Sequence, residues 1–120
     1  MLVRYKKSCE KIAMGLLSFM PKERELKKLR ATMQLYQTNP DWQLFFWKES
    51  EAIIGLIGVE MANGHFTIHH LSVNPSYQGE GIGHAMVKRI QELLAGMDMR
   101  GTEETELFLE KCSEQALVLI

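Results

Sequence analysis

The chain has 120 residues and a mass of 13.8 kDa, enough for one hydrophobic core, so we expect a single domain over residues 1–120. Hydrophobic residues make up 46% and charged residues 24% of the sequence, a balance that excludes global disorder. No apolar run reaches the roughly 20 residues of a membrane helix. The start of the chain is also too mixed for a signal peptide, so we expect a cytoplasmic protein without membrane contact.

Positive and negative charges are separated along the chain, although the net charge is only −1. Residues 1–48 hold ten lysines and arginines against four acidic residues, whereas residues 49–120 hold four against eleven. Much of the basic excess lies in Lys22–Arg30, where acidic residues are interleaved and apolar positions keep a helical spacing. Because no aromatic residues alternate with the basic ones, this pattern favours a solvated helix face over a nucleic-acid-binding surface.

The cysteines and histidines do not indicate a metal centre. Cys9 and Cys112 lie far apart, and neither has a second cysteine at the spacing of a metal or redox motif, so we interpret both as buried thiols. The four histidines lack the companion residues of a zinc site. We therefore expect no metal.

The first third of the chain predicts a short strand and two helices. After an extended start at Met1–Tyr5, apolar residues at helical spacing predict one helix that ends near Pro21 and a second that runs from Pro21 to Asn39. The apolar faces of these helices consist of Ile12, Leu16, Leu17 and Met20 in the first and Leu26, Leu29, Met33 and Tyr36 in the second.

Three strands of one antiparallel meander follow. Aromatic and β-branched residues predict strands at Trp42–Trp47, Ala52–Met61 and His65–Val73. The polar segment Lys48–Glu51 joins the first two as a hairpin. Asn63-Gly64, a dipeptide favoured in tight turns with positive φ, joins the last two.

The character of the sequence changes after this meander. Residues 74–83, NPSYQGEGIG, place turn formers and alternating glycines before a helix that starts at Ile82 and ends near Gly96. Backbone N–H groups in such a turn can converge on one anion, and the positive end of the helix dipole adds to the attraction. The dinucleotide-binding fingerprint would need glycine where His84 stands. The segment therefore predicts a phosphate-binding loop of another kind.

The segment Leu71–Gly83, LSVNPSYQGEGIG, closely resembles the acetyl-CoA-binding signature of GNAT-type N-acetyltransferases. The preceding helices and strands are also similar to the family in their order, and the sequence looks most like the small acetyltransferase-like proteins of bacterial riboflavin operons. The resemblance implies an α/β chain of the α+β type, a minimal GNAT fold with a mixed central sheet flanked by helices. It also implies transfer of an acetyl group from acetyl-CoA to an amine of a small molecule or protein.

The resemblance also implies how the coenzyme binds. The strand ending at Val73 separates from its parallel neighbour around a bulge, and the pantetheine arm pairs with the exposed backbone. The amides from Gln78 to His84 hold the pyrophosphate, and Ile82 belongs more to the core than to the contact. The implied coenzyme-binding residues are Leu71, Ser72, Val73, Gln78, Gly79, Glu80, Gly81, Ile82, Gly83 and His84.

Acetyl transfer to an amine requires a group that takes a proton from the nucleophile. The first candidate is Glu110, because ELFLEKC alternates like a strand and is similar to the L-x-L-E-V strand of ribosomal-protein N-acetyltransferases, whose glutamate serves as base. Residues 97–104 then form a loop, and a short final helix begins at Ser113. The alternatives are a helix over Glu103–Cys112 and, for Glu110 itself, a solvated surface carboxylate.

Other titratable residues are further catalytic candidates. Glu60 follows an apolar run and is either a carboxylate in a partly buried cleft or a charge at a strand end. Strand alternation predicts His69 and His70 on opposite faces, so at most one of them faces a given cleft and relays a proton. The tyrosine that protonates the coenzyme thiolate in many relatives has no counterpart here, which leaves Tyr77 and Tyr36.

The last residues, SEQALVLI, are not followed by the strand pair that usually closes this fold, so the apolar Leu117–Ile120 and a sheet edge need cover. We therefore expect a homodimer. These departures from the family pattern leave two alternatives open: a non-catalytic acyl-CoA-binding or regulatory protein, and an interaction module whose glycine loop contacts a partner's phosphate. The acidic second half is compatible with a cationic amine acceptor, and a riboflavin-pathway intermediate follows from the resemblance alone.

Overall fold

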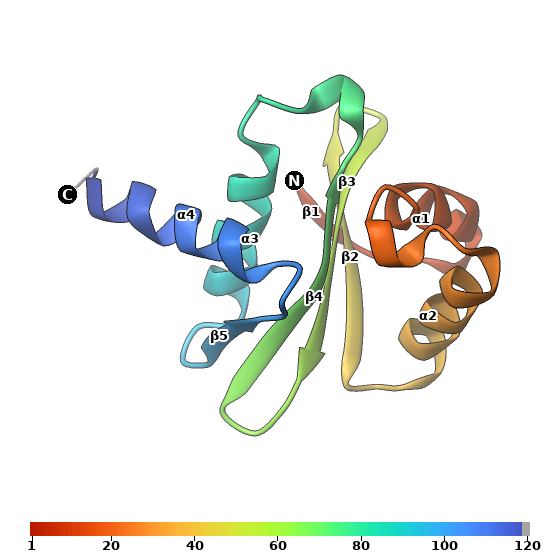
Figure 1. The fold of residues 1–120 in the computed structure, drawn as a ribbon, viewed down its shortest axis with the longest axis horizontal. Coiled ribbons are helices and arrows are strands. Elements are labelled where there is room, and N and C mark those ends of the chain that lie inside the picture. Colours follow the sequence, from red (N-terminus) through yellow and green to blue (C-terminus); the bar gives the residue numbers. More distant parts are fainter. Residues whose placement is uncertain (119–120) are drawn as a thin grey trace.

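The computed structural model describes residues 1–118 and, within helix α4, side chains only as far as residue 112. Its centre is a five-stranded sheet in the order β1-β2-β3-β4-β5 (Figure 1). The first four strands are antiparallel neighbours, and β5 pairs in parallel with β4, so the predicted mixed sheet is confirmed. The strands are β1 (Leu2–Arg4), β2 (Trp42–Glu49), β3 (Ala52–Met61), β4 (His65–Val73) and β5 (Asp98–Gly101).

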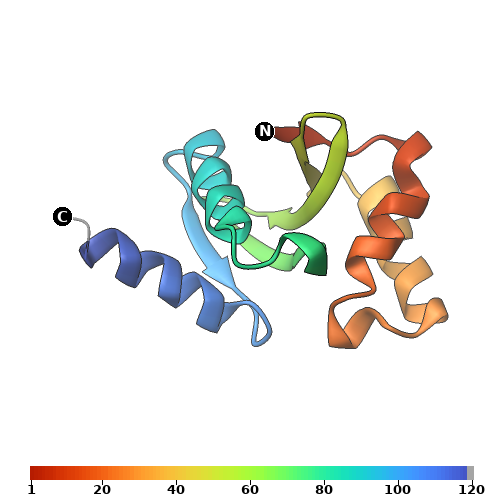
Figure 2. The ribbon, with the colours of Figure 1, turned by 90° about the horizontal axis from the view of Figure 1, so that it is seen from above.

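Helices cover both faces of this sheet (Figure 2). α1 (Glu10–Leu17) and α2 (Leu26–Thr38) pack on one face, whereas α3 (Ile82–Leu93) and the start of α4 (Glu106–Val118) pack on the other. The short strand β5 runs between α3 and α4, as Figure 2 shows. This arrangement is the α+β fold class that the sequence predicts.

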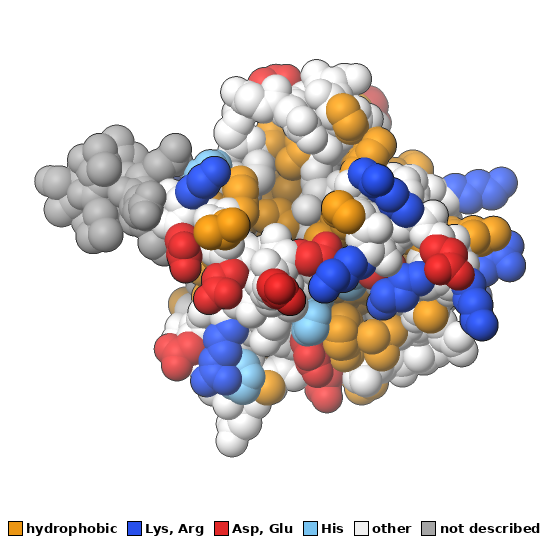
Figure 3. Space-filling model, viewed as in Figure 1, with side chains coloured by type: hydrophobic (Ala, Val, Ile, Leu, Met, Phe, Trp, Pro, Cys, Tyr) orange, Lys and Arg blue, Asp and Glu red, His pale blue; other side chains and the backbone are white. Residues whose placement is uncertain are grey.

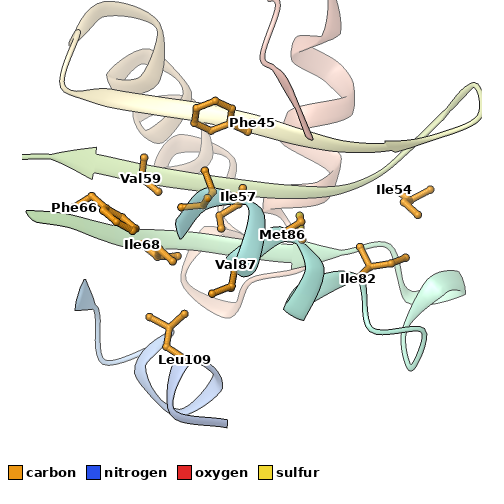
Figure 4. Close-up of a cluster of buried hydrophobic side chains, with 11 residues drawn as sticks. Phe45, Ile54, Ile57, Val59, Phe66, Ile68, Ile82, Met86, Val87 and Leu109 are labelled. Carbon is orange, nitrogen blue, oxygen red and sulfur yellow. The ribbon is translucent and has the colours of Figure 1, made fainter. Parts of the chain in front are cut away.

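Each face of the sheet has its own hydrophobic core, because successive side chains of a strand point to opposite faces. Ile57 of β3 packs with Met86 and Ile90 of α3 in the first core, part of which is drawn in Figure 4. Its neighbour Leu56 packs with Met33 of α2 in the second. Burial of these two apolar layers supplies the main driving force for folding.

The predicted meander is confirmed, with β3 and β4 at the predicted bounds. The second helix starts later than predicted, because Pro21–Glu23 forms a separate 3₁₀ turn and α2 begins only at Leu26. Ile12 and Leu26, assigned to the apolar faces of the two helices, are 45% and 55% exposed. The buried face of each helix is therefore narrower than its sequence pattern indicates.

The predictions for the C-terminal region are wrong in two places. The predicted loop over residues 97–104 contains β5, and the segment ELFLEKC lies in α4 rather than in a strand. In a strand, Leu107 and Leu109 would lie on the same face. Leu109 is buried whereas Leu107 is 71% exposed, so a helix accounts for the burial of these two side chains better. Thr105 also lies one helical turn before Leu109 and accepts a hydrogen bond from the backbone of Thr102. The alternative, a helix in this region, is therefore the correct one.

Within residues 1–118, no helix has the length and hydropathy needed to cross a bilayer. The same part of the chain holds no cluster of three or more histidines, cysteines or acidic residues able to bind a metal ion. Cys9 and Cys112, predicted to be buried, are half-buried free thiols. The side chains of Leu117–Ile120, on which the expected homodimer depends, lie outside the described residues.

Candidate functional site

Strands β4 and β5 separate halfway along β4. Their parallel pairing runs only from His65 opposite Asp98 to Ile68 opposite Gly101. At the point of separation, Oγ1 of Thr105 donates a hydrogen bond of 2.8 Å to the carbonyl of Ile68, so the start of α4 satisfies a backbone group that β5 no longer reaches. Beyond this point β4 remains paired with β3, but no described strand pairs with its other edge.

A cleft of about 590 Å³ opens at this separation, between the free edge of β4, the glycine loop before α3 and the start of α4. Figure 3 shows hydrophobic side chains inside the hollow. All the residues implied to bind coenzyme line this cleft, with the exception of Glu80. The lining residues are Met20, Leu71, Ser72, Val73, Tyr77, Gln78, Gly79, Gly81, Ile82, Gly83, His84, Glu104, Thr105 and Phe108.

The glycine loop takes a backbone conformation that other residues rarely adopt. Gly79 and Gly81 have φ values of +86° and +79°, in the left-handed region. Gly81 is the N-cap of the 12-residue helix α3 and has no side chain to accept hydrogen bonds from the first turn. The free N–H groups of that turn and the positive end of the helix dipole therefore lie at the cleft, where an anion would be stabilised.

Helix α4 packs closely on the first turn of α3. A Cβ atom at Gly83 would lie 2.7 Å from Cζ of Phe108, so only glycine allows this approach. The ring of Phe108 also contacts the imidazole of His84, with 4.9 Å between ring centroids. Nε2 of His84 is buried and has no hydrogen-bond partner. A buried donor or acceptor without a partner is costly, so this atom is suited to a ligand in the cleft.

A second group of polar side chains lies on the other face of the sheet, between β4 and the α1–α2 connection. Nε2 of His70 lies 3.0 Å from Oε1 of Glu23, and its Nδ1 lies 2.6 Å from the hydroxyl of Tyr36. Oγ1 of Thr32 donates to Oε2 of Glu23 over 2.8 Å. Because a carboxylate only accepts hydrogen bonds, Nε2 of His70 donates to Glu23, and Nδ1 shares a hydrogen bond with the phenol of Tyr36.

Both ends of this Glu23–His70–Tyr36 chain are buried, Glu23 at 3% and Tyr36 at 7% exposure. Burial alone would raise the pKa of the Glu23 carboxyl. The hydrogen bonds from His70 and Thr32, together with the charges of His70 and Lys28, instead lower this pKa below its usual value. Burial, with the nearby charges of Glu23 and Glu60, raises the pKa of Tyr36 well above its usual value. The Glu23–His70–Tyr36 chain of hydrogen bonds therefore has a carboxylate at one end and a neutral phenol at the other.

A β-bulge explains why the prediction that His69 and His70 lie on opposite faces is wrong. In the pairing of β3 with β4, Gly58 is opposite His70 whereas Val59 is opposite Ile68, so His69 is the extra residue. His70 contacts Tyr36 on the α2 side, and the ring of His69 stacks on Trp42 on the same side, with 4.4 Å between centroids. The predicted Glu60 also lies here, 2.9 Å from Nε2 of His69.

A smaller cleft of about 230 Å³ lies beside this polar chain. Glu104 lines both clefts, so the two adjoin, and β4 contributes His70 to the smaller and Leu71 to the larger. Two lysines lie near the carboxylates of the smaller cleft. Nζ of Lys28 lies 3.7 Å from Glu23, and Nζ of Lys22 lies 3.8 Å from Glu104. Its lining residues are Lys22, Glu23, Lys28, Thr32, Leu35, Trp42, His69, His70, Thr102 and Glu104.

The structure brings some predicted catalytic candidates together and separates others. Tyr77 lines the larger cleft and His70 the smaller, whereas Glu60 borders neither. Glu110 is exposed on α4 and lines neither cleft, and the strand that suggested its role is absent. Sequence reasoning missed Glu23, because this residue lies in a charge-rich segment whose pattern is typical of a solvated helix face.

Comparison with known proteins places this geometry in a family. A model of the acetyltransferase (GNAT) family matches residues 11–117. A Bacillus methanolicus protein described as an uncharacterized N-acetyltransferase in the lysA 3' region is 56% identical over 113 residues, which are 93% of this chain and 94% of that protein.

Two solved structures show the same fold. An acetyltransferase from Thermus thermophilus matches with a TM-score of 0.74 at 13% identity, over 92% of this chain and 83% of that one. AAC(6')-Iy, in complex with the bisubstrate analogue CoA-S-monomethyl-acetylneamine, matches with a TM-score of 0.71 at 16% identity, over 98% of this chain and 88% of that one.

The mixed sheet that separates beside a glycine loop defines an acyltransferase fold. The family match and the 56% identical relative show, more specifically, that this chain belongs to the acetyltransferase (GNAT) family of N-acetyltransferases.

Proposed function

We propose that this N-acetyltransferase takes its acetyl group from acetyl-CoA, bound in the larger cleft, and transfers it to an amine of a small molecule or protein. One observation carries the proposal: the free edge of β4 and the uncapped first turn of α3 open into the same cleft. The first is suited to the amide-bearing pantetheine arm, which can pair with backbone like an added strand. The second is suited to the pyrophosphate.

The residues of the chain then have distinct roles. Bound acetyl-CoA would supply an activated thioester. Leu71 and Val73 carry the backbone edge, and Gln78 to His84 carry the amides and the unpartnered Nε2 of His84 that suit a phosphate-bearing ligand. Phe108 contributes an apolar wall to the cleft. Tyr77 is our candidate for returning a proton to the leaving thiolate, because it is the phenol that lines this cleft.

Calorimetry followed by a thiol-release assay tests this function. Acetyl-CoA and CoA should bind with similar affinity and ATP much more weakly, and a panel of primary amines should include one that gives CoA release. The panel should include amine-bearing riboflavin precursors, because these would test the predicted link to riboflavin-operon proteins. The homodimer also remains a prediction. Absence of acetyl-CoA binding at millimolar concentration would contradict the proposal.

One observation favours the alternative, an acyl-CoA-binding or regulatory protein without turnover. Both nitrogens of His70 already have hydrogen-bond partners within the protein, Glu23 and Tyr36, so this imidazole has no free position for a substrate proton. Tight acetyl-CoA binding without CoA release over the whole amine panel would select this alternative.

A further inference from the structure

Any acceptor of the acetyl group has to reach the thioester, because bond formation requires the reacting atoms to be about 3–3.5 Å apart. The acceptor site must therefore border the coenzyme cleft. The smaller cleft meets this requirement, since Glu104 lines both and consecutive residues of β4, His70 and Leu71, line one each.

The carboxylate of Glu23 is an unusual component of this smaller cleft. Its side chain is 4% exposed and is held by His70 and Thr32, which together fix both oxygens. Burying a carboxylate is costly unless it is hydrogen-bonded and paired with a cation. The ammonium of Lys28 lies 3.7 Å from Oε1 of Glu23, and the Lys28 side chain is 55% exposed. Only the lysine side of this pair is exposed to solvent, so another ammonium could take the position of Lys28.

We propose that the smaller cleft is the acceptor site, and that it binds a small primary amine as its ammonium ion against the carboxylate of Glu23. The ammonium loses one proton to solvent before transfer, and the lone pair of the neutral amine then attacks the thioester carbon and displaces the CoA thiolate. This inference rests on the proposed transferase function. Trp42 provides an apolar wall for the body of the amine, with His69 stacked on its ring and Tyr36 at its edge. His70 and Thr32 act as positioning residues, because their hydrogen bonds hold the Glu23 carboxylate in place, and Tyr36 in turn holds His70.

The two tryptophans of the chain give a direct test of binding. In ¹⁵N-labelled protein with saturating CoA, benzylamine should shift the indole N–H signal of Trp42, whereas the uncharged benzyl alcohol should not. Trp47 is an internal control, because it packs in the other core and its indole donates to Glu49. Equal shifts with the amine and the alcohol, or none at Trp42, would overturn the assignment.

Two variants test the role of Glu23 itself. Glu23→Gln removes the charge and should weaken benzylamine binding at least tenfold, with the Kd for CoA unchanged. Lys28→Gln removes the ammonium that competes with the ligand for Glu23. Because Lys28 is exposed, this change does not affect the core, and it should tighten benzylamine binding severalfold. Lys27→Gln is the matched control, because Lys27 is exposed on the same helix and does not line the cleft. If Lys28→Gln binds benzylamine no more tightly than Lys27→Gln does, the proposal is wrong.

Kinetics separate this proposal from the function on which it rests. With an amine that is a substrate, Glu23→Gln should raise the KM for the amine at least tenfold and leave the KM for acetyl-CoA unchanged. The acceptor is either a free amine or a lysine side chain, so benzylamine and Nα-acetyl-lysine amide are compared. An unchanged amine KM in an active Glu23→Gln enzyme refutes the acceptor site alone. Failure of the wild-type protein to bind acetyl-CoA refutes the function, whatever benzylamine does at Trp42.

Discussion

The ring of Phe108 lies directly on Gly83, so that α4 closes over the first turn of α3 and forms one wall of the larger cleft. Two elements that are separate in sequence meet here through a residue without a side chain. The contact joins the first turn of α3, which we propose holds the phosphate, to the start of α4, where Thr105 donates a hydrogen bond to the carbonyl of Ile68. The shape of the cleft therefore depends on this contact.

Gly83→Ala should lower the free energy of unfolding by about 1–3 kcal/mol, because the added methyl overlaps Phe108. In a Phe108→Ala background the same change should be neutral or stabilising by up to about 1 kcal/mol, since alanine favours the helix more than glycine does. Urea unfolding of the wild type, both single variants and the double variant measures the coupling. Additive effects would show that the two residues do not interact.

Gly81→Val should abolish most of the binding of acetyl-CoA. The residue has a φ of +79° and caps α3, so a β-branched side chain strains the loop and displaces the amides that face the cleft. Gly96→Val is the matched control, because Gly96 has a φ of +90° but lies at the other end of α3, outside the cleft. Calorimetry should show a loss of at least tenfold for Gly81→Val and little change for Gly96→Val, and equal losses would contradict this role of the loop.

The elements that sequence predicts well are those whose own pattern specifies them. β3 and β4 have long apolar or alternating patterns and definite turns, and the glycine loop has few possible conformations. The segment ELFLEKC has both a strand-like and a helix-like pattern, and the choice is made by tertiary contacts: Thr105 bonds to Ile68, and Leu109 packs in the core. Local patterns contain no information about these partners.

The polar chain on the other face of the sheet was less accessible to prediction. A single bulge residue, His69, reverses the alternation of β4 and places both histidines on the α2 side. Glu23 is buried only because the 3₁₀ turn before α2 directs it at His70, which is 47 residues away in the chain. Neither the bulge nor the turn has a distinct sequence signal, so the smaller cleft could be found only in the structure.

Glu110→Gln should leave turnover within about twofold of the wild type, in contrast to the expectation from the sequence. The carboxylate is exposed on α4, and it lines neither cleft. A general base has to be within hydrogen-bond reach of the proton that it takes, directly or through one water. Steady-state kinetics with the best amine of the panel measures the effect, and a drop of a hundredfold in kcat would restore Glu110 as the base.

Glu23 should stabilise the fold in a pH-dependent way at the acidic end. Its pKa is lowered in the folded protein, so its contribution is present above the unfolded value near 4.5 and is lost as the pH falls through the folded value. The difference in free energy of unfolding between the wild type and Glu23→Gln should therefore decrease from pH 5 to pH 3. The remaining carboxylates titrate in both proteins and largely cancel in this difference. A constant difference over this range would contradict the charged state assigned to Glu23.

Tyr36 should have the opposite pH dependence at the alkaline end. Burial raises the pKa of its phenol well above 10.0, so the unfolded chain loses this proton at a lower pH than the folded protein does. The stability that depends on the neutral phenol is then fully present below pH 10 and decreases as the pH rises toward the folded value. Tyr36→Phe lacks this group, so its free energy of unfolding should fall less than that of the wild type between pH 9 and pH 11. Tyr77→Phe, which removes a phenol that lines the larger cleft, is the control, and a fall as steep in Tyr36→Phe as in the wild type would contradict the buried, neutral state of Tyr36.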